Sequence, residues 1–483
     1  MSSPIRLLAI LIVALLLRPA LAQNLPPEVD AALARAKVPR EAVALLVVDA
    51  AGKAPARLSH RASVPMNPAS VMKLVTTYAA LDLLGPAYSW RTPVYVEGAV
   101  KDGTLLGNLY IKGQGDPKLV AERLWLLLRR VQGLGIQKIT GDIVLDHSAF
   151  EAVDADPASF DGEPLRPYNA APDALLVNFK SVVMTFVPDR LANTASVQFE
   201  PPLAGVRMQS SVPLANDSSG SNGSCGDYRA ALKADFSDPA RIRFAGSYPA
   251  ACLEKVWPVA YADPSSYNTR AVQGLWQQMG GQLGGSVRDG SVPPLTLARP
   301  PTFELLSPPL AEVIRDINKY SNNVMAQQVF LTLSLADQGR ATRAASREVV
   351  RRWWQQRISA SEAPTLDNGS GLSRQERISA QGLARLLQTA WASPLMPELM
   401  SSLPIAGIDG TLKRSQARSP GRAHLKTGSL RDVVAVAGYV HAASGQRYVL
   451  VALVNHANAN AARPALEALL DWTVRDNGAY VPD

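Results

Sequence analysis

The sequence predicts an α/β (α+β) fold in which an outer part, residues 23–90 and 265–483, is interrupted by an inserted β-rich region, residues 91–264. Three observations predict this arrangement. A buried strand and an amphipathic helix come first, short strands with Pro, Gly and Ser turns follow, and helices return before a final β-hairpin. Because exposed loops tolerate insertions best, we place a boundary just after the first helix, and the insertion has room for two subdomains.

The first elements of the outer part are a strand and a helix. Residues 43–48 are continuously apolar and end at a Gly-containing turn, which predicts a buried strand. Beyond Pro68 the apolar spacing changes to i, i+3, i+4, i+7, which predicts a helix that stops at Gly85-Pro86. The apolar residues with this spacing are Val71, Leu74, Val75 and Tyr78.

The middle region reads mainly as strands. Residues 94–101 and 104–113 flank Asp102-Gly103, a dipeptide that favours a tight hairpin turn. A helix is expected over 120–131, and short strands continue to about residue 261.

The last part of the chain is predicted to be helical and then to form a hairpin. Helical spacing returns at residues 310–317 and dominates to about residue 400. Strands are expected over 433–440 and 448–455, and a final amphipathic helix follows Pro464.

Composition excludes several classes of protein. Of the 483 residues, 47% are hydrophobic and 19% are charged, so the chain can bury ordinary cores and is neither disordered nor of low complexity. The net charge of +8 is spread along the chain, whereas a nucleic-acid-binding protein needs a clustered basic face.

The first 22 residues have the pattern of a cleaved secretory signal peptide. A positive Arg6 precedes the apolar stretch 7–17, and Ala20-Leu21-Ala22 supplies the small residues that a signal peptidase needs. The alternative is a membrane anchor, but this stretch is well short of the ~20 residues that span a bilayer. We therefore expect an exported, periplasmic protein that begins at Gln23 after cleavage.

Two cysteines, Cys225 and Cys252, are the only ones in the chain. In an exported protein such a pair is expected to form a disulfide, and the alternative of two buried thiols suits a reducing compartment.

Three short motifs carry the chemistry. In chain order they are Ser70-Val71-Met72-Lys73, Ser321-Asn322-Asn323 and Lys426-Thr427-Gly428-Ser429. S-x-x-K is expected about once by chance in a chain of this composition, and K-T-G well under once. The context adds specificity, because Ser70 opens a predicted helix, which puts Lys73 one turn on and on the same face.

These residue types suit nucleophilic catalysis. A serine hydroxyl is a poor nucleophile until a neighbouring base removes its proton. Lys73 can act as that base if burial and a second cation lower its pKa. Lys426 would stay charged and bind a substrate carboxylate, and Gly428 would let a substrate approach the backbone closely.

The motifs and their surroundings resemble the penicillin-recognising serine peptidases. Within that group the chain is similar to the D-alanyl-D-alanine carboxypeptidases/endopeptidases of the class C, low-molecular-mass penicillin-binding proteins, which carry a large insertion between the first two motifs. The supporting segments are Asn67-Pro68-Ala69-Ser70, Gly113-Gln114-Gly115-Asp116-Pro117, residues 367–374 and residues 403–412. The resemblance covers essentially the whole mature chain and implies a β-lactamase/transpeptidase-like domain, an antiparallel sheet flanked by helices.

The resemblance also implies roles for the motif residues. Ser70 would be the acylated nucleophile and Lys73 the general base. Ser321 and Asn323 would relay a proton and hold the substrate amide, while Lys426 and Thr427, in the Lys426–Ser429 motif, would bind the terminal carboxylate. The N–H groups of Ser70 and Ser429 would form the oxyanion hole.

The chain departs from the family pattern in its middle motif. Asn322 stands where relatives often have Asp, at the position expected to matter least. The acidic residue of the insertion that reads a substrate amine in the family is assigned to Asp154, with Asp156 and Asp161 as neighbouring alternatives.

No metal or cofactor is expected. The histidines have no H-E-x-x-H or comparable ligand spacing, and no G-x-S-x-G motif points to a Ser-His-Asp hydrolase. Arg374 could bind a substrate carboxylate, but a structural ion pair in its loop is the expected role.

The predicted function is a serine-type peptidase that acts on peptidoglycan stem peptides and cross-links and is inhibited by β-lactams. The alternatives are a β-lactamase, which the missing E-x-x-L-N run disfavours, and a non-catalytic penicillin-binding cell-wall protein. Peptidoglycan peptides are the expected partner, with peripheral contact to the membrane or cell wall and no nucleic acid.

Overall fold

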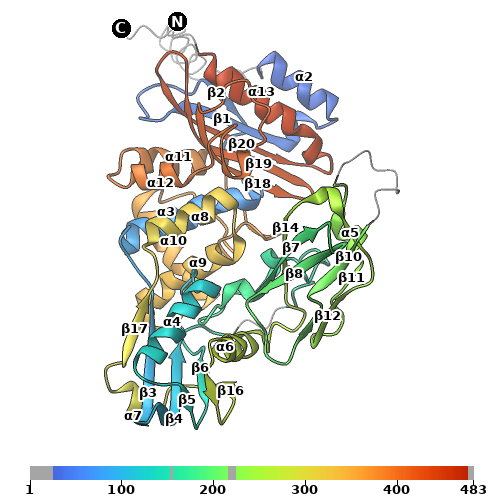
Figure 1. Cartoon of the computed structure of the whole chain (residues 1–483). Coiled ribbons are helices and arrows are strands. Elements are labelled where there is room, and N and C mark those ends of the chain that lie inside the picture. Colours follow the sequence, from blue (N-terminus) through green and yellow to red (C-terminus); the bar gives the residue numbers. More distant parts are fainter. Residues whose placement is uncertain (1–24, 153–155, 216–224, 477–483) are drawn as a thin grey trace, which may run out of the picture.

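The computed structural model describes residues 25–152, 156–215 and 225–476 (Figure 1). The predicted signal peptide, residues 1–22, and Asp154 lie outside the described residues. Among the helices within these ranges, none has the length and apolar character needed to cross a membrane.

The outer part is built on a five-stranded antiparallel sheet that joins the two ends of the chain. Its strand order is β18-β19-β20-β1-β2, and Val43 of the first strand pairs with Val454 of the last. The strands are β1 (Val43–Asp49), β2 (Leu58–His60), β18 (Ala423–Leu430), β19 (Val433–His441) and β20 (Arg447–Asn455). This pairing explains why the chain can carry a large insertion between its early and late segments.

Helices cover both faces of this sheet, which is why its central strands are almost continuously apolar. Alternate residues of β19 enter two different cores: Ala435 and Ala437 pack with the large helical group, and Val434 and Val436 with the terminal helices. The terminal helices are α2 (Pro27–Arg35) and α13 (Arg463–Val474). The helical group comprises α3 (Lys73–Leu84), α8 (Leu310–Tyr320), α9 (Asn323–Gln338), α10 (Arg343–Arg357), α11 (Ala380–Trp391) and α12 (Met396–Ser402).

The middle region contains a seven-stranded sheet at the opposite end of the molecule from α2 and α13 (Figure 1). The expected hairpin forms β3 and β4, which turn at Asp102-Gly103. Its strands are β3 (Arg91–Lys101), β4 (Thr104–Lys112), β5 (Lys138–Ile139), β6 (Ile143–Asp146), β15 (Gln282–Leu283), β16 (Val287–Asp289) and β17 (Phe303–Leu306). Helices α4 (Ala121–Gly133) and α6 (Tyr267–Gln278) share its apolar core, and α7 (Pro294–Leu297) is a single short turn.

Two further sheets complete the middle region. A five-stranded sheet contains β7 (Ser181–Asp189), β8 (Thr194–Glu200), β10 (Ser211–Ala215), β13 (Tyr248–Pro249) and β14 (Lys255–Ala260). A three-stranded sheet contains β9 (Arg207–Met208), β11 (Ala234–Asp235) and β12 (Arg241–Phe244), next to α5 (Tyr228–Leu232). The predicted disulfide between Cys225 and Cys252 is present here and confirmed.

Short 3₁₀-helices complete the chain. They are Arg40–Ala42, Ala69–Met72, Pro167–Asn169, Asn178–Lys180, Ala250–Cys252, Gly410–Leu412 and Ala459–Ala462.

The structure differs from the sequence prediction at two places. Strands β15, β16 and β17 pair with β5, β6 and β3, so the sheet of the middle region extends to residue 306 and past the expected boundary at 264. We therefore propose that the inserted region runs from 91 to 306. In addition, the Lys426-Thr427-Gly428 motif lies within a strand that the sequence did not predict, β18, which pairs with β19 at the edge of the sheet.

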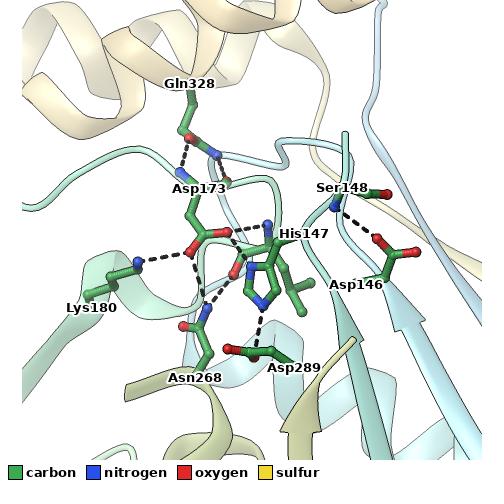
Figure 2. Close-up of polar contacts among 9 residues, drawn as sticks. Asp146, His147, Ser148, Asp173, Lys180, Asn268, Asp289 and Gln328 are labelled. Carbon is green, nitrogen blue, oxygen red and sulfur yellow. Dashed lines mark hydrogen bonds and ion pairs between the residues drawn. The ribbon is translucent and has the colours of Figure 1, made fainter. Parts of the chain in front are cut away.

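A partly buried ionic network joins the middle region to α9 (Figure 2). The Asp173 carboxylate accepts a hydrogen bond from His147 at 2.5 Å and pairs with Lys180 at 2.8 Å, while the other His147 nitrogen faces Asp289 at 3.2 Å. Gln328 of α9 exchanges two hydrogen bonds with the backbone of Asp173, at 2.9 and 2.8 Å. Because α9 begins at Asn323, these contacts with the middle region help to fix the position of Asn323, a residue of the second motif.

Candidate active site

The three motifs meet at a cavity of about 1240 Å³ between the helical group, β18 and the middle region. Ser70, Ser321, Asn323, Thr427 and Ser429 all line it, although they are up to several hundred residues apart in the chain. The two motif lysines lie behind this lining and are fully buried.

Ser70 lies in the 3₁₀ turn Ala69–Met72 that leads into α3. Asn67 holds the approach to this turn, because its side chain accepts a hydrogen bond from the Ala69 N–H at 2.9 Å and donates one to the Ser373 carbonyl at 2.9 Å. Strand β18 passes very close: a Cβ atom on Gly428 would lie 2.4 Å from the Pro68 carbonyl oxygen. Glycine is therefore needed at 428 because the strand contacts the backbone beside Ser70. The sequence indicated a different reason for this glycine, the close approach of a substrate to the backbone.

Lys73 donates hydrogen bonds to groups from three segments. Its Nζ lies 3.1 Å from Ser70 Oγ, 2.6 Å from Asn323 Oδ1 and 2.5 Å from the Ser370 carbonyl oxygen. Burial lowers the pKa of Lys73 to about 7, against the opposing charge of Glu376, which raises it. An amine with this pKa is present in both its neutral and its charged form near neutral pH.

Lys426 occupies the opposite side of the motif cluster. Its Nζ donates to Ser321 Oγ at 2.9 Å and to its neighbour's carbonyl, Thr427 O, at 2.7 Å. Burial, and then the charge of Lys73, lower the pKa of Lys426 well below its ordinary value. The sequence predicted that Lys426 stays charged; burial and the neighbouring Lys73 amine both oppose that charge.

The Ser321-Asn322-Asn323 motif is the junction between α8 and α9. Ser321 ends α8 in a left-handed conformation, with φ at 59°. Asn322 is the N-cap of α9, because its side chain accepts the Met325 N–H at 3.0 Å. Asp and Asn cap helices about equally well, so this position tolerates the departure from the family pattern that the sequence shows. Asn323 is then the first residue of α9 and faces Lys73.

The hydroxyl groups of β18 are held by residues that the motifs did not indicate. Thr427 Oγ1 lies 2.7 Å from Thr411 Oγ1, within the 403–412 segment that supported the resemblance. Ser429 Oγ accepts a hydrogen bond from Arg463 Nη2 at 2.5 Å. Arg463 opens α13, more than thirty residues further along, and nothing in the local sequence indicated this contact.

Arg374 forms an ion pair at 2.8 Å, but its partner is Asp432, between β18 and β19, and not a residue of its own loop. Its guanidinium also lies 5.0 Å from the ring centre of Phe160, a residue of the middle region, and both Arg374 and Phe160 line the cavity. Of the acidic residues considered beside Asp154, Asp161 lines the same cavity and hydrogen-bonds to Tyr168.

Within residues 25–152, 156–215 and 225–476, no group of three or more His, Cys, Asp or Glu side chains could hold a metal ion. The three motifs bring to the cavity the Ser70 hydroxyl, the two lysine amines and the amide and hydroxyl groups around them.

Comparison with known proteins identifies the family. A D-alanyl-D-alanine carboxypeptidase from Actinomadura sp. (strain R39) is 26% identical over 412 residues, which cover 83% of this chain and 75% of that protein. The crystal structure of penicillin binding protein 4 (dacB) from Haemophilus influenzae has a TM-score of 0.70 at 22% identity, and the match covers 92% of this chain and 99% of that one. A second structure of that protein, in complex with a β-lactam, has a TM-score of 0.66 at 22% identity and covers 92% of this chain and 100% of that chain.

A family model also matches most of the chain. Residues 25–475 match the D-Ala-D-Ala carboxypeptidase 3 (S13) family. This range contains the helical group, the β18-β19-β20-β1-β2 sheet and the whole middle region. The chain belongs to the D-Ala-D-Ala carboxypeptidase 3 (S13) family of peptidases.

Proposed function

We propose that the protein is a serine-type D-alanyl-D-alanine carboxypeptidase/endopeptidase that acts on peptidoglycan stem peptides and cross-links through an acyl-serine intermediate. The observation that carries the proposal is the 3.1 Å hydrogen bond between Lys73 Nζ and Ser70 Oγ, at the wall of the cavity. Because the pKa of Lys73 is lowered to about 7, the amine can accept the serine proton under physiological conditions.

In the proposed acylation step, neutral Lys73 takes the Ser70 hydroxyl proton while Oγ bonds to the carbonyl carbon of the penultimate D-alanine. The N–H groups of Ser70 and Ser429 bind the resulting oxyanion. Collapse of this intermediate breaks the C–N bond, and the departing amine takes the proton that Lys73 removed from Ser70, relayed through the Ser321 hydroxyl, so Lys73 is neutral again. In deacylation Lys73 removes a proton from water as the water oxygen bonds to the ester carbonyl carbon. The C–Oγ bond then breaks, the proton passes from Lys73 to Ser70 Oγ, and the shortened peptide leaves.

The substrate carboxylate is proposed to bind beside Lys426, Thr427 and Ser429. Since Lys426 and Lys73 lower each other's tendency to be charged, an arriving carboxylate would favour the proton on Lys426 and leave Lys73 neutral. Binding of the correct substrate would thereby prepare the base. Penicillin, which also carries a carboxylate next to an acylating carbonyl, would use the same groups, and a family relative has been solved with a β-lactam bound.

Export to the periplasm is part of the proposal. It is supported by the signal-peptide pattern of residues 1–22 and by the disulfide between Cys225 and Cys252, since disulfides persist in oxidising compartments. We also propose that the acidic residue of the insertion that reads a substrate amine is Asp154, on the family resemblance alone. Peripheral contact with the membrane or cell wall likewise remains a proposal.

Release of D-alanine tests this function. Purified mature protein should release D-alanine from a stem pentapeptide, and Ser70→Ala should reduce the rate by at least about a thousandfold. Ser401→Ala, at an exposed serine of α12, is the matched control and should leave the rate unchanged. Digesting purified peptidoglycan in parallel separates free D-alanine from resolved cross-links. Unchanged release by the Ser70→Ala variant would contradict the proposal.

A further inference from the structure

Glu376 is a fully buried carboxyl group that follows the 367–374 segment, and none of the three motifs contains it. Its two oxygens accept four backbone hydrogen bonds from that segment. Oε1 accepts the N–H groups of Asp367, Asn368 and Gly369 at 3.2, 3.1 and 2.8 Å, and Oε2 accepts the Gly371 N–H at 2.9 Å. One side chain therefore organises the whole turn from 367 to 371.

The hydrogen-bond pattern matches an ionised carboxylate. Every group that contacts the two oxygens is an N–H donor, and a neutral carboxyl would turn its own proton toward one of them. Burial raises the pKa of Glu376 above its ordinary value, and the backbone N–H partners offset this shift only in part. Removing an acceptor from this turn would leave several buried N–H groups without a partner, which is energetically costly.

A single peptide unit connects this carboxylate to the catalytic lysine. The carbonyl of Ser370 accepts the hydrogen bond from Lys73 Nζ at 2.5 Å, and the N–H of Gly371, on the other side of the same peptide bond, donates to Glu376. The peptide dipole is thus aligned between an amine and a carboxylate, with its negative end toward the amine.

The turn also lies directly against the nucleophile. Gly371 has φ at +82°, and a Cβ atom there would lie 1.7 Å from the Ala69 carbonyl oxygen and 2.5 Å from the Ser70 nitrogen. Thr76 of α3 fastens the other end by donating to the Gly369 carbonyl at 2.6 Å. Any movement of the turn would be transmitted to Ser70 and Lys73.

We propose that Glu376 is a positioning residue of this active site: its carboxylate holds the 367–371 turn, aims the Ser370 carbonyl at Lys73 and supplies the negative charge that opposes the desolvation of the lysine. This inference rests on the proposed function, in which Lys73 is the base. Without the charge, burial acts on Lys73 unopposed, so the lysine becomes neutral at lower pH and is a weaker base.

The test is the pH dependence of acylation by a fluorescent penicillin, measured as a second-order rate constant per folded molecule from pH 5 to pH 9. In Glu376→Gln the acid limb should move to lower pH by about one unit, and the plateau rate should fall. Glu376→Asp keeps the charge but holds it further from the turn. The acid limb of its pH profile should therefore also move to lower pH, by less than the limb of the Gln variant. Asp116→Asn, at another buried carboxyl group outside the cavity, is the matched control and should leave the limb in place.

A slower rate with an unmoved acid limb in both Glu376 variants would overturn the inference and leave Glu376 a structural residue only. If the Gln variant does not fold, the Asp variant alone decides between these outcomes. Failure of the proposed function would look different, because the unsubstituted protein would then show no acylation at Ser70 at any pH.

Discussion

At the scale of single residues, two buried lysines lie within the cluster of the three motifs. Lys73 contacts Ser70 and Asn323, whereas Lys426 contacts Ser321 and its own strand. Burial lowers the pKa of both amines, so two full charges in this cluster would be costly. Their different hydrogen-bond partners are the basis for the different tasks that we propose for them.

Substitution by arginine separates these tasks. Lys73→Arg keeps a cation but cannot deprotonate in a protein, so acylation by penicillin should nearly vanish across pH 6–10. Lys426→Arg keeps the charge that attracts a carboxylate, so measurable acylation should remain, with weaker binding. The second-order acylation rates of the two variants, measured side by side, check this assignment. Equal losses in both, or a functional Lys73→Arg, would show that Lys73 only occupies space near Ser70.

Sequence reasoning reached the motif residues and missed those that hold them. Serine and lysine one helical turn apart form a local pattern, and local patterns can be read directly. The contact of Lys73 with Ser370, in the turn that Glu376 organises, exists only after segments far apart in the chain pack together. The Asp367–Arg374 segment was noted for its resemblance, but the carboxylate two residues beyond it gave no signal of its own.

At the scale of elements, the hairpins and long helices were predictable and strand β18 was not. Its sequence, Ala423–Leu430, contains a lysine, a glycine and two hydroxyl residues, which is a poor match to the alternating pattern of a half-buried strand. The strand exists because β19 pairs with it along its whole length and because Gly428 fits against the Ser70 turn. Its unusual composition reflects its place in the active site.

The His147–Asp173 network between the middle region and α9 should make stability depend on pH in the alkaline range (Figure 2). Burial lowers the pKa of His147, but its contacts with Asp173 and Asp289 outweigh this effect and raise it to about 9. Because the folded pKa lies above the ordinary value of 6.5, the stabilisation is full below about pH 6.5 and disappears as the pH rises through 9.

His147→Asn should therefore lose about 1–3 kcal/mol of unfolding free energy at pH 7 and almost nothing at pH 10, relative to the unsubstituted protein. Urea unfolding followed by tryptophan fluorescence at both pH values measures this difference. His60→Asn, at a ring that contacts the Arg40 carbonyl, is the matched control and should show no such change between the two pH values. An equal loss at pH 7 and pH 10 would mean that the charge of His147 contributes nothing.

At the scale of the whole molecule, the fold places one continuous active site across two parts of the chain. The outer part contributes the three motifs, and the middle region contributes cavity residues such as Phe160, Asp161 and Tyr168. The sequence predicted this bracketed arrangement with an insertion that ends at 264, whereas we propose that it ends at 306. The strands between 282 and 306 are only two to four residues long, so they resemble loops until their partners in β3, β5 and β6 are known.

The central claim is that Ser70 forms a covalent acyl-enzyme at the meeting point of the three motifs. The most direct measurement is intact-mass analysis of the mature protein after exposure to penicillin G, followed by peptide mapping of the adduct. We predict one penicillin adduct per chain, on the peptide that contains Ser70, and no adduct in Ser70→Ala. An adduct that persists in Ser70→Ala or maps to another residue, or a folded protein that forms none, would contradict the claim.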